Sequence, residues 1–176
     1  ATHILHHALQ QNLGTHAQQQ GSKVDGDWLR FDFTNLSAVP GEQLATIEAK
    51  TVSCIEAAAP FTARTVPLAE ARQAGAMMLF GEKYPAPVRM VSMGDFSKEL
   101  CGGTHLENTR DVGSFEITAE EAVSSGVRRV IALTGEKARE HARQTRLALA
   151  ECAQLLEVDE LQTPAAAAGL ARTVRD

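Results

Sequence analysis

The sequence is poor in cysteine and contains no long hydrophobic run. Its cysteines, Cys54, Cys101 and Cys152, are an odd number at wide spacing. This pattern excludes a disulfide framework and suits a reducing compartment. No apolar stretch approaches the roughly 20 residues that span a bilayer, and no secretory signal pattern is present. These absences predict a soluble, cytoplasmic protein with no membrane partner.

An excess of positive charge is also lacking. The formal net charge is −5 at pH 7, so overall electrostatics do not attract this chain to nucleic acid. Any RNA contact must come from a local cluster of Arg and Lys side chains. Hydrophobic residues make up 44% and charged residues 22%, which excludes a disordered or fibrous chain. The 176 residues suffice for one domain with a core and an appendage.

Hydrophobic residues at helical spacing predict several helices. The first ends at Gly14, and the second has Pro40 at its first position and ends before Pro60. Cys54 and Cys152 lie beside alanines and leucines in these patterns, so both are predicted to be buried, inert thiols. The predicted helices cover approximately residues 1–13, 40–59, 67–75 and 136–156, with a further helical stretch around 165–168.

Alternating hydrophobic residues predict strands between these helices. The turn Asp25-Gly26 and the run from Trp28 to Phe33 predict a β-hairpin with Leu29, Phe31 and Phe33 on its buried face. Further strands are expected at residues 61–66, 77–80, 88–93, 113–118 and 127–133.

Strands and helices mix without strict alternation, which predicts an α+β fold with a mostly antiparallel sheet and helices packed on one face. Residues 1–134 are expected to form the core domain. Residues 135–176 are expected to form a long helical connector towards a C-terminal domain, because the helix is rich in Arg, Glu, Gln and Ala and only weakly amphipathic.

Two stretches concentrate metal-ligating side chains: residues 3–7 on the first helix, and residues 101–105. Zinc prefers thiolate and imidazole ligands in tetrahedral geometry. The Cys101-x-x-x-His105 pair encloses Gly102 and Gly103, which allow a tight turn around one ion. His3 and His7 lie four apart on one helical face and could supply the remaining ligands. By spacing alone these histidines are equally consistent with solvated or hydrogen-bonded residues.

Longer motifs resemble the editing core shared by alanyl- and threonyl-tRNA synthetases. The opening ATHILH at residues 1–6 resembles the start of that core, and SKELCGGTH at residues 97–105 resembles its second zinc motif. Three further stretches resemble the alanyl family in particular: Gly21-Ser22 leading into residues 29–33, residues 75–84, and residues 91–96. The resemblance covers about residues 1–135 and implies the two-layer fold of this editing (second additional) domain.

The activity that the resemblance implies is hydrolysis of wrongly charged Ser-tRNA(Ala) and Gly-tRNA(Ala). An alanine pocket cannot strongly exclude smaller glycine or the one extra hydroxyl of serine, so such a synthetase needs a second, hydrolytic site. The expected partners are tRNA(Ala) carrying a wrong amino acid and the rest of the synthetase chain. Nothing here matches the aminoacylation domain or the upstream barrel with its Gly-Gly-Gln loop, so this segment is not expected to charge tRNA.

The family binds zinc through His-x-x-x-His and Cys-x-x-x-His motifs. Matching these motifs places ligands at His3, Cys101 and His105, and the first histidine would fall two residues before Ala1. Alternatively, His7 substitutes from the next turn, or the site is incomplete. The bound Zn²⁺ is expected to polarise or position a water that attacks the ester, or to orient the amino group of the substrate.

Several other residues have both a functional and an ordinary interpretation. Gln19 matches a position near the editing pocket of the family, where it would contact substrate or organise the water, but it is also an ordinary solvated residue of a glutamine run. Thr104 would hydrogen-bond the substrate or simply close the turn. Glu99 would support a ligating histidine or lie exposed at a strand end. Arg128 and Arg129 point to opposite faces of a strand, so one of them would meet RNA phosphate, whereas the ordinary interpretation of both is a surface ion pair.

Two other functions fit the same motifs. One is a freestanding deacylase that edits tRNA without an attached synthetase; the long helix after residue 134 and the motif at residues 80–84 argue against it. The other is a non-catalytic tRNA-binding module stapled by zinc, in which four protein ligands would close the metal site. The sequence does not predict the oligomeric state.

Overall fold

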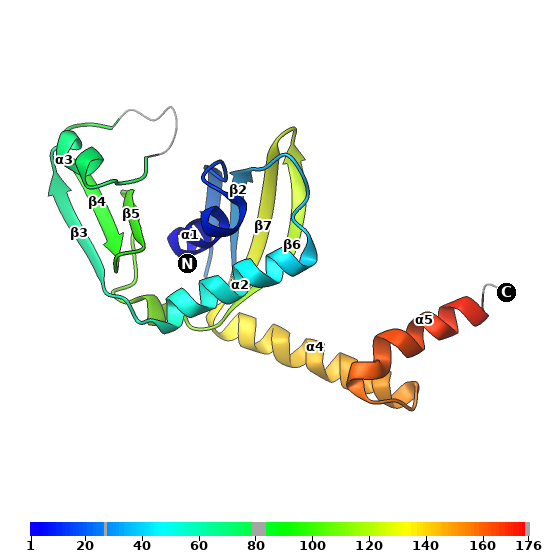
Figure 1. The fold of residues 1–176 in the computed structure, drawn as a ribbon. Coiled ribbons are helices and arrows are strands. Elements are labelled where there is room, and N and C mark those ends of the chain that lie inside the picture. Colours follow the sequence, from blue (N-terminus) through cyan, green and yellow to red (C-terminus); the bar gives the residue numbers. More distant parts are fainter. Residues whose placement is uncertain (27, 79–83, 175–176) are drawn as a thin grey trace. The chain divides into compact units, whose positions relative to one another are not determined.

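A computed structural model describes residues 1–26, 28–78 and 84–174 (Figure 1). The elements in chain order are α1 (Thr2–Leu13), β1 (Gln19–Val24), β2 (Trp28–Thr34), α2 (Gly41–Glu56), β3 (Phe61–Val66), α3 (Leu68–Gln73), β4 (Val88–Met93), β5 (Ser97–Leu100), η1 (Thr109–Val112), β6 (Phe115–Ser124), β7 (Val127–Thr134), α4 (Gly135–Leu155), η2 (Glu160–Gln162) and α5 (Thr163–Thr173).

The chain divides into two compact units, Ala1–Ala138 and Arg139–Asp176. The first unit contains both sheets and the first three α-helices, and the division falls inside the first turn of α4. The functional division predicted at residues 134 and 135 stays a prediction, because compactness alone does not assign a role to either part.

The first unit contains a four-stranded antiparallel sheet with the strand order β1-β2-β7-β6. The predicted hairpin is confirmed, since β1 pairs with β2 antiparallel and Val24 lies opposite Leu29. In the next pair, Phe31 of β2 lies opposite Val130 of β7. Helices α1 and α2 cover one face of this sheet (Figure 1). The α+β class with helices on one sheet face is therefore confirmed.

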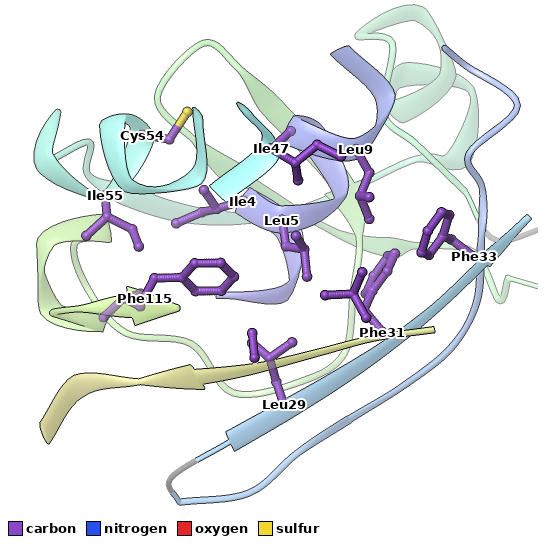
Figure 2. Packing of buried hydrophobic residues seen from close by; sticks show 14 of the residues in the cluster. Ile4, Leu5, Leu9, Leu29, Phe31, Phe33, Ile47, Cys54, Ile55 and Phe115 are labelled. Atoms are coloured by element: carbon purple, nitrogen blue, oxygen red, sulfur yellow. The ribbon is translucent and has the colours of Figure 1, made fainter. Parts of the chain in front are cut away.

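The main hydrophobic core fills the space between this sheet and the two helices. Leu29, Phe31 and Phe33 are fully buried, as their alternation along β2 predicts. Figure 2 shows them packed against side chains from α1, α2 and β6, namely Ile4, Leu5, Leu9, Ile47, Cys54, Ile55 and Phe115. This core fixes α1, and with it His3, against the rest of the unit.

A second, three-stranded antiparallel sheet has the order β3-β4-β5 and its own small core around Val66, Val88 and Met90. The sequence predicts one sheet and no strand at residues 97–100. That strand has too few residues to show alternation, and Lys98 and Glu99 hide it further. Its backbone pairing with β4, from Met90 opposite Leu100 to Met93 opposite Ser97, is what makes it a strand.

Other boundaries differ modestly from the predictions. Strand β6 continues to Ser124, beyond the expected end at residue 118, because its polar second half still pairs with β7. Pro40 precedes α2 as its N-cap and does not occupy the first helical position. The strand predicted at residues 77–80 and the motif at residues 80–84 lie mostly outside the described residues. Met77, which the structure does describe, makes an isolated parallel bridge to Glu99.

The second unit consists of the main part of α4 with η2 and α5. Cys152 on α4 is exposed, so the prediction of a buried thiol is wrong there, because its apolar neighbours are only partly covered by α5. Cys54 is buried as predicted, and burial raises the pKa of its thiol. Among the described residues, no helix has the length and hydrophobicity to cross a membrane.

Candidate metal centre

The structure brings together the three side chains predicted as metal ligands. His3 comes from α1, whereas Cys101 and His105 come from the turn that follows β5. One ligand atom from each residue lies within 4.8 Å of the others. His3 is buried and the other two are half-buried, so the group lies at the boundary between protein and solvent.

Glu99 determines which nitrogen of His3 faces this group. The Glu99 Oε2 atom lies 2.6 Å from His3 Nδ1, so Nδ1 carries a hydrogen and donates a hydrogen bond to the carboxylate. The other nitrogen, Nε2, lies 3.0 Å from Nε2 of His105. A carboxylate that holds the far nitrogen of an imidazole is the usual partner of a metal-ligating histidine.

Glu99 is a buried carboxylate with two histidine neighbours. It is 6% exposed, and its Oε1 atom lies 3.6 Å from Nδ1 of His6. Burial alone would raise the pKa of Glu99, but the hydrogen bond from His3 and the proximity of His6 outweigh it and lower the pKa to about 2. The carboxylate is therefore ionised at neutral pH. The sequence allowed two interpretations of Glu99. Its burial and its contact with His3 fit support of a ligating histidine and do not fit exposure at a strand end.

His105 is held between two rings. Its imidazole stacks on Phe61 with ring centroids 4.6 Å apart and on His3 with centroids 5.2 Å apart. Burial, with the nearby charges of His3 and Arg89, lowers the pKa of His105 to about 4. The imidazole is therefore neutral at pH 7, the form that binds metals.

The donor set fits zinc. One thiol and two imidazoles are ligands that Zn²⁺ prefers, and tetrahedral coordination places neighbouring donor atoms about 3.3–3.6 Å apart. The separation of 3.0 Å between the two imidazole nitrogens is close to that value. Nδ1 of His105 is buried without a hydrogen-bond partner among the described residues. The group could therefore hold a metal ion.

The other histidines of α1 do not join this group. The His7 ring packs on Phe96 with ring centroids 5.2 Å apart, so the structure does not support His7 as a substitute ligand. His6 is 1% exposed, and its Nε2 lies 3.2 Å from the carbonyl oxygen of Ala17. His6 is therefore a buried packing residue of α1.

A cavity of about 100 Å³ adjoins the ligand group. Its lining includes His3 and Cys101 together with the polar side chains of Thr2, Gln19 and Ser22. Nε2 of Gln19 donates a hydrogen bond of 3.0 Å to Oγ of Ser22, which holds the amide at the cavity wall. Thr104 is exposed in the ligand turn and does not line this cavity. The structure thus brings Gln19, but not Thr104, to the cavity.

Sequence reasoning missed two residues that contact the ligand turn, Arg89 on β4 and Phe61 on β3. Nη1 of Arg89 donates to the carbonyl oxygens of Cys101 and Gly103, and Phe61 stacks on His105. Neither residue lies near the metal motif in the sequence. A single Arg or Phe in a strand does not by itself indicate a metal site.

Arg128 and Arg129 lie in ion pairs within the four-stranded sheet. Arg128 binds Glu120 through Nε at 2.6 Å, and Arg129 binds Asp32 through Nε at 2.6 Å and Nη2 at 2.9 Å. The ion-pair interpretation of these two residues is therefore confirmed.

Comparison with known proteins agrees with the motifs. Residues 88–131 match the family model of the threonyl and alanyl tRNA synthetase second additional domain. The chain is 57% identical over 99% of its length to an alanine–tRNA ligase of Rhodopirellula baltica, and 47% identical over 100% of its length to one of Pelotomaculum thermopropionicum. It spans only 18% and 20% of those two relatives, respectively.

Proposed function

Since the chain is similar along its whole length to one segment of alanine–tRNA ligases, we propose that it is the editing part of such an enzyme. Its reaction is zinc-dependent hydrolysis of Ser-tRNA(Ala) and Gly-tRNA(Ala). The observation that carries this proposal is a cavity whose lining combines two of the three metal-ligating residues with the polar residues Thr2, Gln19 and Ser22. The match of residues 88–131 to the second additional domain supports the same assignment.

The ligand residues have distinct roles in this proposal. His3, Cys101 and His105 hold Zn²⁺, and Glu99 keeps Nε2 of His3 aimed at it through the bond to Nδ1. When bound, the ion supplies a Lewis acid at the wall of the cavity. Gln19 presents its amide in the cavity, where it binds the amino acid or orients the attacking water. Thr104 lies outside the cavity lining and is assigned to the part of the substrate nearer solvent.

The reaction is an ordinary ester hydrolysis. Water adds to the ester carbonyl carbon, the bond from that carbon to the ribose oxygen breaks, and the products are the free amino acid and tRNA with a free terminal hydroxyl. The cavity of about 100 Å³ has room for a small side chain such as that of serine. A hydrolytic site for small amino acids complements a charging pocket that cannot reject them by size.

The same assignment gives the partners of this segment and the place of its reaction. The rest of the synthetase chain charges tRNA, wrongly charged tRNA(Ala) is the substrate, and the reaction takes place in the cytoplasm. A freestanding deacylase and a zinc-stapled binding module are the competing functions. The ligand group adjoins a cavity with Gln19 and Ser22 in its lining, which favours hydrolysis over a purely structural zinc, because four protein ligands close a structural zinc site.

The test is release of radiolabelled serine from Ser-tRNA(Ala), with Ala-tRNA(Ala) as the matched control substrate. The proposal predicts release from the seryl substrate and little from the alanyl one. Equal release from both would favour an unspecific esterase. Binding of the charged tRNA without release would favour the zinc-stapled binding module.

A further inference from the structure

The turn that carries two of the three ligands is poorly held by its own residues. Gly102, Gly103 and Thr104 are exposed. The N–H of Gly103 donates to Sγ of Cys101 at 3.4 Å, a weak bond within the turn. A short glycine-containing segment of this kind has many accessible conformations, so its ordering costs conformational entropy. Contacts from outside the turn must fix the positions of Cys101 and His105.

Arg89 supplies such contacts from the neighbouring strand β4. Its Nη1 atom lies 2.7 Å from the carbonyl oxygen of Cys101 and 3.0 Å from that of Gly103. The backbone N–H of Cys101 in turn donates to the carbonyl oxygen of Arg89 at 3.2 Å. One guanidinium nitrogen therefore donates to the carbonyl groups before and after Gly102. These hydrogen bonds connect the turn to strand β4 of the sheet.

Phe61 of β3 connects this guanidinium with the second ligand. Its ring stacks on His105 with an interplanar angle of 15° and centroids 4.6 Å apart. The guanidinium carbon of Arg89 lies 5.9 Å from the centroid of the same ring, within cation–π range. Arg89 and Phe61 thus contact both ends of the ligand turn.

We propose that Arg89 is a positioning residue that sets the Cys101–His105 turn in its metal-binding conformation before the ion arrives. Ligands already in place lose less conformational freedom on binding, so the affinity for the metal rises. Loss of an outer-shell support of this kind typically weakens metal binding by about 10–100-fold. The inference rests on the metal site of the proposed function, but it concerns metal affinity and does not depend on hydrolysis.

The test compares variants of the 176-residue chain, each prepared metal-free. Zn²⁺ affinity is measured by competition with a chromophoric chelator, and Co²⁺ absorption reports coordination by thiolate. Arg89→Met should bind Zn²⁺ about 10–100-fold more weakly than the wild type. Arg89→Lys, which keeps a charged donor, should recover part of that loss. Far-UV circular dichroism of the metal-free variants verifies that each is folded.

Arg64→Met is the matched control. Arg64 lies on β3 of the same sheet, and its contact is an exposed ion pair with Glu70 at 3.4 Å, so this variant should keep wild-type affinity. A folded Arg89→Met variant that binds Zn²⁺ as tightly as the wild type would overturn the role of Arg89 and leave the metal site intact. Equal weakening in Arg64→Met, or no recovery in Arg89→Lys, would also overturn it. A wild-type chain that binds no Zn²⁺ would overturn the metal site and the role of Arg89 together.

Discussion

At the scale of single residues, the two nitrogens of His3 have different partners, and this division determines what the imidazole can do. Nδ1 is 2.6 Å from the Glu99 carboxylate, while Nε2 faces His105. The ionised carboxylate fixes the tautomer and makes the ring a stronger ligand. Glu99 lies two residues before Cys101. The C-terminal end of β5 therefore positions both the ligand Cys101 and the carboxylate that orients the ligand His3.

Replacement of Glu99 by glutamine removes this charged support. We expect Glu99→Gln to lower Zn²⁺ affinity by about 10-fold or more, because the neutral amide holds Nδ1–H of His3 less strongly. Equilibrium competition with a chelator measures the effect. Glu121→Gln, at a carboxylate on β6 with a side chain that is 52% exposed, is the control. Unchanged affinity in Glu99→Gln would refute the assigned support.

Cys101 supplies the only thiolate in the ligand group. We expect Cys101→Ala to lose stoichiometric zinc and to release serine at no more than about a hundredth of the wild-type rate, since two imidazoles bind zinc far more weakly than a set with a thiolate. Cys152→Ala, which removes an exposed thiol in the second unit, should keep both properties. A Cys101→Ala chain with full zinc content and full rate would contradict the ligand assignment.

At the scale of elements, a bidentate ion pair links two adjacent strands. Arg129 of β7 binds both carboxylate oxygens of Asp32 of β2, and Asp32 is 8% exposed. The hydrogen bond from Arg129 lowers the pKa of Asp32 despite the opposing effect of burial. Because the pKa is lower in the folded state, the pair stabilises the fold above the unfolded value of about 3.9, and this contribution disappears as pH falls through the folded pKa.

Asp32→Asn should therefore destabilise the chain most at neutral pH. The difference in free energy of unfolding between wild type and variant should shrink below about pH 4, where the Asp32 carboxyl of the unfolded wild-type chain begins to bind a proton. Urea denaturation at pH 7, 5 and 3 measures this difference. Asp25→Asn, in the exposed hairpin turn, should show little effect at any pH. A difference for Asp32→Asn that stays constant with pH would be inconsistent with the ion pair.

Elements with a strong local signal could be predicted from the sequence. The Asp25-Gly26 turn and the alternation of Leu29, Phe31 and Phe33 are local, and the hairpin follows from them. Strand β5 could not be predicted, because its pairing with β4 is a tertiary property of a short, partly charged segment. The burial of Glu99 depends on that pairing and on the packing of α1, so its contact with His3 was visible only as one of two alternatives.

At the scale of the whole molecule, the metal group lies entirely in the first compact unit, Ala1–Ala138. Motifs in the sequence sufficed to select His3, Cys101 and His105, whose convergence needs only that α1 and the turn after β5 meet. The contacts that support them, from Arg89 and Phe61, come from strands distant in the sequence and needed the structure.

Truncation after Ala138 tests the independence of this unit. We expect residues 1–138 to fold with a Zn²⁺ affinity within about twofold of the longer chain, because every described contact of the ligand group lies inside the unit. Circular dichroism and chelator competition check fold and affinity. Loss of zinc binding from a folded truncated chain would show that the second unit contributes to the site.

The proposed hydrolysis of wrongly charged tRNA depends on zinc held by His3, Cys101 and His105. The most direct measurement is the rate of serine release from Ser-tRNA(Ala) by the metal-free chain as Zn²⁺ is titrated in. Zinc-dependent hydrolysis should give negligible release without metal, a rise that saturates near one equivalent of Zn²⁺, and reversal by a chelator. Full release by the metal-free chain, unaffected by Zn²⁺ or chelator, would contradict it.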